Sequence, residues 1–227
     1  MNVHMQEQTK YHGAGISEAK AFVLSLHGRN HSPDIILEIA DRIGLDGVHY
    51  AAPQAFQNSW YPERFMEPIE KNEPFLTYSL EVCRRQLQQW TENGVPTEKI
   101  VLMGFSQGAC LAAEYAIRNP ERYGGLLIFT GALIGPEGTK WADRGSFEGT
   151  SVFLGTSDED EWIPVERVHE TEAIFIKRGA QTDKRIYKGM GHLVNDDEID
   201  AARSLLKGII NAESDNSMLM GSKNLND

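Results

Sequence analysis

The segment Gly104-Phe105-Ser106-Gln107-Gly108 has the residue types and spacing of a turn that carries a nucleophilic serine. A serine that attacks a carbonyl carbon must stand clear of the backbone, and a sharp strand-to-helix turn achieves this. Glycines two positions on either side remove the Cβ atoms that would collide in such a turn. The alternative is a glycine-flanked turn that serves packing only. An all-apolar stretch at 100–103 precedes the motif and an alanine-rich helical pattern follows it, so we expect Ser106 to be a nucleophile.

A histidine in a glycine-rich segment could serve as the base for this serine. His192 ends the sequence Lys188-Gly189-Met190-Gly191-His192, between the last predicted strand and the last predicted helix. An imidazole can take the serine proton and then protonate the leaving group. The other histidines share no metal-ligand spacing such as H-E-x-x-H, so we expect neither a metal nor another cofactor.

A carboxylate is needed to orient His192 and to stabilise its imidazolium form. The stretch 155–164 follows a buried strand and holds four acids, namely Asp158, Glu159, Asp160 and Glu161. One of them would contact His192, and the others would be solvated loop charges. The order serine, acid, histidine along the chain is that of α/β-hydrolases.

Two backbone N–H groups must bind the oxyanion that forms during acyl transfer. The N–H of Gln107, directly after the serine, is one candidate. The N–H of Arg29, in the turn after the first buried strand, is the second, because Gly28 permits close approach of a substrate there. The alternative for that turn is an ordinary strand end.

Alternating strand and helix patterns predict the scaffold that positions these groups. Strands are expected at 21–26, 48–52, 100–103, 126–130, 151–154 and 185–187, and helices at 33–43, 74–93, after Ser106, at 164–178 and from 195 onward. Residues 1–13 are expected to be loose, and 53–71 to be irregular. This order predicts an α/β fold with a mostly parallel sheet and helices on both faces. We expect a single domain over residues 1–227, with its core at about 20–210 and a polar tail at 213–227.

Composition excludes several classes of protein. With 22 Lys and Arg against 33 Asp and Glu, the net charge is −11, which disfavours nucleic-acid binding and docking to anionic membranes. No apolar run is long enough to span a membrane.

Cys83 and Cys110 lie in apolar helical patterns and are expected to be buried thiols. Residues 1–20 lack an apolar run of seven residues, so we expect no signal peptide and a cytoplasmic location.

Four motifs carry a resemblance to the phospholipase/carboxylesterase family of α/β-hydrolases, which includes acyl-protein thioesterases and small bacterial carboxylesterases. They are Leu26-His27-Gly28-Arg29, Gly104-Phe105-Ser106-Gln107-Gly108, Asp160-Glu161-Trp162-Ile163-Pro164 and Gly189-Met190-Gly191-His192. The resemblance covers about residues 20–210 and implies the α/β-hydrolase fold without a large lid. The family usually has glycine where Asn30 stands, and asparagine tolerates unusual backbone angles better than most residues.

The resemblance also bears on the acid. The family's acid lies in an Asp-Pro-x-Val-Pro context, four residues before the last proline, and this aligns Asp160. Here Glu161 replaces the first proline, and Leu154 replaces a usual histidine before Gly155. Counting forward from Gly155 reaches Asp158 instead. We therefore expect Asp160 to be the acid, with Asp158 as the alternate.

The aromatic stretch 60–65 resembles the family segment that forms a wall of the substrate pocket. The alternative is a satellite hydrophobic cluster under a long loop. We expect Trp60, Tyr61, Trp162 and Leu133 to line a small apolar pocket.

These observations predict a serine carboxylesterase that cleaves small or short-chain carboxylic esters through an acyl-enzyme intermediate. The alternatives are an acyl thioesterase or lysophospholipase, and a non-catalytic binding protein that keeps the hydrolase fold. The expected partner is a small-molecule ester, and the sequence leaves the choice between a monomer and a homodimer open.

Overall fold

The computed structural model describes residues 1–221 of the chain and is built around one seven-stranded sheet. The order of the strands across the sheet is β1-β3-β2-β4-β5-β6-β7. Only β1 pairs antiparallel, with β3, and the other pairs of neighbours in residues 1–221 are parallel. The strands are β1 (Thr9–Gly13), β2 (Ala21–Leu26), β3 (Val48–Pro53), β4 (Ile100–Phe105), β5 (Gly125–Phe129), β6 (Ser151–Ser157) and β7 (Gln181–Tyr187).

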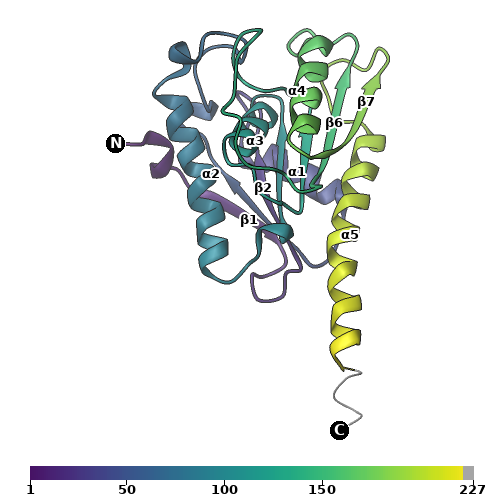
Figure 1. Cartoon of the computed structure of the whole chain (residues 1–227). Coiled ribbons are helices and arrows are strands. Elements are labelled where there is room, and N and C mark those ends of the chain that lie inside the picture. The colour runs from purple at the N-terminus through teal and green to yellow at the C-terminus, as the bar shows by residue number, and fades with distance from the viewer. Residues whose placement is uncertain (222–227) are drawn as a thin grey trace.

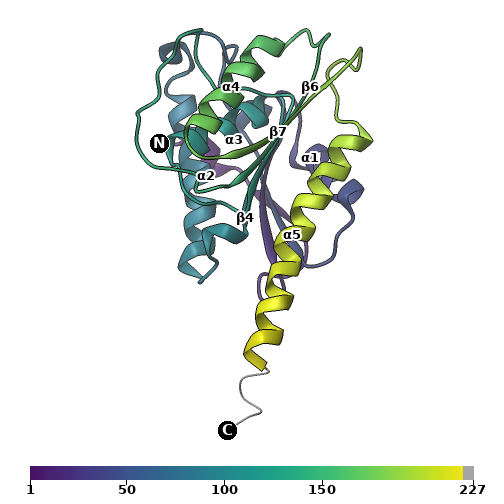
Figure 2. The same ribbon diagram turned by 45° about the vertical axis from the view of Figure 1, so that its right-hand side comes forward.

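Helices cover both faces of the sheet (Figure 1). They are α1 (Pro33–Ile43), α2 (Phe75–Glu92), α3 (Gln107–Arg118), α4 (Val165–Lys177) and α5 (Asp196–Gly221), with short 3-10 helices at Val3–Gln6, Phe56–Asn58, Ile69–Asn72 and Thr97–Lys99. Figure 2 shows α1 and α5 on one side of the sheet and α2, α3 and α4 on the other. The predicted α/β-hydrolase architecture is therefore confirmed.

The central strands are apolar throughout because both of their faces are covered. In β4, Ile100 and Leu102 belong to the hydrophobic cluster shared with α2, α3 and α4, whereas Val101 and Met103 belong to the cluster shared with α1 and α5. Alternate side chains of a strand point to opposite faces, so one short run of apolar residues supplies both halves of the core.

The chain termini differ from the expectation. Residues 1–13 are not loose, because Val3–Gln6 forms a 3-10 helix and β1 forms an edge strand on β3. The side chains of β1 are mostly exposed, and an edge strand of this kind carries no apolar alternation that a sequence pattern could reveal. At the other end α5 continues to Gly221, into the segment predicted as a tail. Residues 222–227 of that segment lie outside the described residues.

The parallel strands bring the predicted site residues to one edge of the sheet. The carboxyl ends of β2, β4, β6 and β7 lead directly into the segments that hold Arg29, Ser106, Asp160 and His192. Because parallel strands end on the same side of a sheet, four segments that are distant in sequence meet there.

Candidate active site

Ser106 lies in a strained turn between β4 and α3. Its backbone angles are φ 54° and ψ −119°, a conformation that non-glycine residues rarely adopt and that costs roughly 1–3 kcal/mol. A Cβ atom on Gly104 would lie 2.3 Å from the carbonyl of Gly108, and one on Gly108 would lie 2.0 Å from the carbonyl oxygen of Leu26. Both glycines are therefore required for the tight packing of β4, α3 and β2 around the serine.

His192 bridges Ser106 and Asp160. Its Nε2 atom lies 2.8 Å from Ser106 Oγ, and its Nδ1 atom lies 2.8 Å from Asp160 Oδ2. An ionised carboxylate only accepts hydrogen bonds, so Nδ1 carries the hydrogen that is donated to Asp160. In the neutral ring Nε2 is then free to accept the hydroxyl hydrogen of Ser106, as a general base requires.

The carboxylate of Asp160 is buried, and both of its oxygens accept hydrogen bonds. Its side chain is 0% exposed, and Oδ1 accepts hydrogen bonds from the backbone N–H groups of Trp162 at 2.8 Å and Ile163 at 2.9 Å. Burial alone raises the pKa of Asp160, but the hydrogen bonds from His192 and the two N–H groups outweigh it and leave the pKa lowered. Asp160 therefore stays ionised and can stabilise a protonated His192.

Asp158, the alternate acid, has a different position. It is exposed, and its Oδ1 accepts the backbone N–H of Gly189 at 2.7 Å. The buried hydroxyl of Ser157, which the sequence analysis did not single out, accepts the N–H of Gly191 at 3.1 Å. Both side chains hold the turn that precedes His192, and neither contacts its ring.

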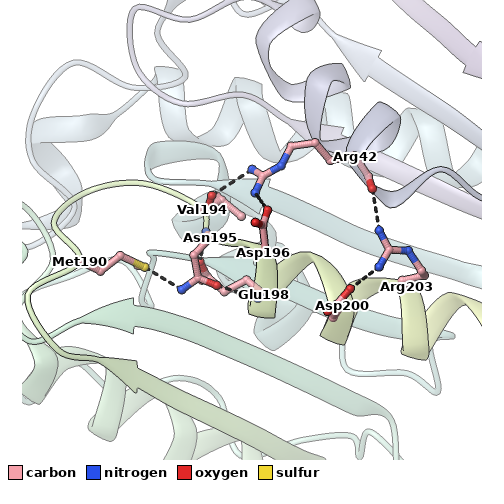
Figure 3. Close-up of polar contacts among 8 residues, drawn as sticks. All are labelled: Arg42, Met190, Val194, Asn195, Asp196, Glu198, Asp200 and Arg203. Atoms are coloured by element: carbon pink, nitrogen blue, oxygen red, sulfur yellow. Dashed lines mark hydrogen bonds and ion pairs between the residues drawn. The ribbon is translucent and has the colours of Figure 1, made fainter.

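The N-terminus of α5 fixes the other side of the His192 segment (Figure 3). Asn195 and Glu198 form a reciprocal cap, in which Glu198 Oε2 accepts the N–H of Asn195 and Asn195 Oδ1 accepts the N–H of Glu198, both at 2.9 Å. The side-chain amide of Asn195 also reaches the sulfur of Met190 at 2.8 Å. His192 thus lies on a short segment that is anchored at both ends.

The proposed oxyanion donors lie beside Ser106. Gln107 is the first residue of α3, where backbone N–H groups have no acceptor within the helix. The N–H of Arg29 has no backbone or side-chain acceptor within residues 1–221. Asn30 adopts φ 62°, the left-handed conformation for which the family's usual glycine is suited, and its N–H donates to Asn58 O at 2.8 Å.

A cavity of about 290 Å³ opens over Ser106 and His192. Tyr61 and Trp162 line it as expected, together with Arg64, Phe65, Phe105, Cys110, Ile163 and the Gly28–His31 turn. Most of this second group could not be found from local sequence patterns, because the positions of these residues around the serine depend on how loops pack. Cys83 and Cys110 are free, buried thiols, as predicted.

Trp60 and Leu133 do not line this cavity, which corrects the expectation for both. Trp60 is fully buried behind Tyr61, and its indole N–H donates to His27 O at 2.8 Å. Leu133 is also buried, and its backbone N–H donates to Thr171 Oγ1 at 3.0 Å. Successive residues of an irregular loop point in different directions, which apolar character alone does not reveal.

Side chains from the site also hold the wall segment 59–63. Gln107 Oε1 accepts the N–H of Trp60 at 2.9 Å, and Gln107 Nε2 donates to Tyr61 O at 2.8 Å. The guanidinium of Arg29 donates to the carbonyls of Pro62 and Glu63. The side chains of Gln107 and Arg29 therefore shape the cavity through their contacts with the wall segment.

Comparison with known proteins identifies the family. A model of the phospholipase/carboxylesterase family matches residues 13–210. The chain belongs to this family. The resemblance depended on motifs around Ser106, Asp160 and His192. Asn30 is a departure from the family pattern that the backbone accommodates.

Individual curated relatives share 25–29% identity with this chain in the two matches that follow. Acyl-protein thioesterase 1 of Eremothecium gossypii is 29% identical over 140 residues, which cover 60% of this chain and 58% of the relative. Acyl-protein thioesterase 1 of Candida albicans is 25% identical over 219 residues, which cover 86% of this chain and 94% of the relative. In the matches to the Eremothecium, Kluyveromyces and Saccharomyces proteins, the chain spans 58–59% of the relative's length.

Solved structures show the same fold. The phospholipase/carboxylesterase of Dyadobacter fermentans superposes with a TM-score of 0.84 at 37% identity, covering 88% of this chain and 96% of the other. The Bacillus cereus carboxylesterase has a TM-score of 0.69 at 17% identity, covering 92% and 99%, a likeness that concerns the fold alone.

Between residues 1 and 221, no three His, Cys, Asp or Glu side chains come together as metal ligands. No helix in the same range is long and apolar enough to cross a membrane.

Proposed function

We propose that this protein is a serine carboxylesterase that hydrolyses small or short-chain carboxylic esters. The observation that carries the proposal is the chain of two 2.8 Å contacts from Ser106 Oγ through His192 to Asp160, at the base of a cavity. Ser106, His192 and Asp160 are the proposed catalytic residues. Membership of the phospholipase/carboxylesterase family supports the same reaction class.

The proposed reaction has two acyl-transfer steps. His192 Nε2 takes the proton of Ser106 as its oxygen attacks the ester carbonyl, while the N–H groups of Gln107 and Arg29 bind the oxyanion. The alcohol leaves with the proton held by His192, and Ser106 keeps the acyl group. Water then repeats the sequence on the acyl-enzyme and releases the acid. Asp160 keeps the imidazole in the required tautomer throughout.

Cavity size favours small substrates. A volume of about 290 Å³ is at the lower end of the roughly 300–1,000 Å³ that is typical of ligand pockets. Tyr61, Phe65 and Ile163 give the cavity an apolar lining that suits alkyl or aryl groups.

An acyl thioesterase is the second candidate, because several relatives are named acyl-protein thioesterase 1. Thioesters and oxygen esters pass through the same kind of acyl-enzyme, so the geometry of Ser106 and His192 suits both. The two candidates differ in leaving group and acyl length.

Rates on p-nitrophenyl esters and matched thioesters of two to twelve acyl carbons test the proposal. We expect highest kcat/KM on short oxygen esters and a loss of about 10⁴-fold or more in Ser106→Ala and His192→Ala. A preference for long-chain thioesters would favour the second candidate.

Labelling by a fluorophosphonate gives an independent readout of the nucleophile. Labelling is expected to disappear in Ser106→Ala and to persist in Ser204→Ala, which changes an exposed serine of α5. Neither labelling nor hydrolysis in the folded wild-type protein would favour the non-catalytic binding protein instead.

A further inference from the structure

A second cavity adjoins the active-site cavity on the side of α1. Its volume is about 310 Å³, and its apolar lining comes from two segments. Ile35, Ile36 and Ile39 on α1 form one wall, and Leu193 and Val194, directly after His192, form the other. We call this cavity the α1 groove.

The α1 groove and the active-site cavity share a wall. Gly28, His31, Phe105 and His192 line both of them, whereas Ser106 lines only the active-site cavity. The ring of Phe105 packs near both histidines, with its centroid 5.9 Å from that of His31 and 5.0 Å from that of His192. The two cavities therefore share a wall that includes His192, while the rest of their linings differ.

The two walls of the groove are tied together at its far end. Arg42, near the end of α1, donates to Val194 O and to Asp196 Oδ1, both at 2.9 Å (Figure 3). Arg203 of α5 in turn donates to the backbone carbonyl of Arg42. These contacts hold the two walls of the groove together.

Large apolar side chains at the groove are exposed to solvent. Ile35 is 42% exposed and Leu193 is 47% exposed. An apolar ligand seated in the groove would remove part of this surface from water, which is favourable. Two charged side chains line the groove. Arg42 is already engaged by Val194 and Asp196, and the carboxylate of Glu38 disfavours an anion.

We propose that the α1 groove binds the alcohol part of the ester, and that this part is an uncharged alkyl or aryl group. The proposal rests on the proposed esterase function. A cavity of roughly 150 Å³ holds a benzene molecule, so the groove is large enough for a benzyl or hexyl group. Ile35 and Leu193 would then determine specificity for the alcohol.

The direction of proton transfer assigns the alcohol, rather than the acyl group, to this groove. In acylation the bond from Ser106 Oγ to the carbonyl carbon forms, and the bond from that carbon to the alcohol oxygen breaks. The alcohol oxygen takes the proton that His192 Nε2 received from Ser106. The leaving oxygen must therefore face the imidazole, and the group attached to it extends past His192 into the groove. The acyl group stays beside Ser106 in the active-site cavity.

Two short series of esters separate the assignments. Hexyl acetate and methyl acetate differ only in the alcohol, whereas methyl hexanoate and methyl acetate differ only in the acyl group. Each fully buried methylene is worth about fourfold in kcat/KM, so hexyl acetate should exceed methyl acetate by about tenfold or more. All acetates form the same acetyl-enzyme, so the preference is expected in acylation and not in the breakdown of that intermediate.

Ile35→Asp is the decisive variant, because it places a charge at the groove on an exposed position. We expect the hexyl-to-methyl acetate ratio to fall by about fivefold or more, while the ratio of methyl hexanoate to methyl acetate changes by less than about twofold. Ile35→Trp, which narrows the groove without adding charge, should lower the first ratio as well. Ile176→Asp, on an exposed position of α4, is the matched control and should leave both ratios unchanged.

The outcomes distinguish failure of the groove assignment from failure of the proposed esterase function. A fall in the ratio of methyl hexanoate to methyl acetate, rather than in the ratio of hexyl acetate to methyl acetate, would assign the groove to the acyl group and overturn the inference. Unchanged ratios in both folded Ile35 variants would also overturn it. If the wild-type protein hydrolyses none of the esters, the proposed function itself fails.

Discussion

Asp158 and Asp160 lie two residues apart in one loop, yet they contact different groups. Asp160 Oδ2 lies 2.8 Å from His192 Nδ1, whereas Asp158 Oδ1 accepts the backbone N–H of Gly189 at 2.7 Å. One carboxylate thus contacts the imidazole, and the other supports the backbone of the turn that leads to it. The loop after β6 provides both.

We therefore expect Asp160→Asn to lower kcat on p-nitrophenyl acetate by about 10³–10⁴-fold, because an amide no longer favours the required tautomer of His192. Asp158→Asn should cost less than about tenfold, since its amide oxygen can still accept the N–H of Gly189. Initial rates at saturating substrate, with circular dichroism to verify folding, measure both. A larger loss in Asp158→Asn would reverse the assignment of the acid.

The side chain of Gln107 provides a second prediction. In Gln107→Ala the buried N–H of Trp60 loses its acceptor, which should lower the free energy of unfolding by about 1–3 kcal/mol. KM should rise because the carbonyl of Tyr61, a wall of the cavity, keeps only the hydrogen bond from Ser59 Oγ, while the backbone N–H of residue 107 remains in place. Urea unfolding and steady-state kinetics test this, with Gln88→Ala on the exposed face of α2 as the control. Equal stability of the two variants would contradict the prediction.

Gly108, in the turn around Ser106, provides a third prediction. A Cβ atom at residue 108 would lie 2.0 Å from the carbonyl oxygen of Leu26, so Gly108→Ala should destabilise the fold by at least about 2 kcal/mol. Gly208→Ala, in α5, meets no atom within 4 Å and should be neutral or stabilising by up to about 1 kcal/mol. Thermal unfolding of both variants gives the comparison. A Gly108→Ala protein as stable as the wild type would mean that β2 and α3 are not packed as closely as described.

Glu198 should make stability depend on pH. Burial raises its pKa to about 7, and the bond from Asn195 and the charge of Arg42 oppose this only in part. The folded state therefore holds a proton that the unfolded state loses near pH 4.5, so stability falls as the pH rises from about 4.5 to 7. Glu198→Gln keeps the acceptor for Asn195 and cannot ionise.

The difference in unfolding free energy between Glu198→Gln and wild type should thus grow in favour of the variant across this window, by up to about 3 kcal/mol. Urea unfolding at a series of pH values measures it. Glu121→Gln, at an exposed position, controls for the loss of one charge. A difference that stays constant with pH would show that Glu198 is not held in its protonated form.

Local patterns were sufficient for the scaffold and for the serine and histidine motifs. The apolar strands, the glycines around Ser106 and the glycine-rich segment before His192 are short-range features, because strand burial and tight turns restrict residue types within a few positions. The edge strand β1 left no such pattern, since its exposed side chains are polar whether or not the backbone pairs.

Which residues meet across the sheet was decided only by the tertiary structure. The sequence offered Asp158 and Asp160 as alternatives, and the fold brought Asp160 to the imidazole. The fold also buries Trp60 and Leu133 in the core. It brings Ile35 of α1 and Leu193 into the lining of one cavity. Contacts between segments that are distant in sequence, such as Asp160 and His192 at 32 residues apart, depend on the packing of whole strands and helices, and no local periodicity records them.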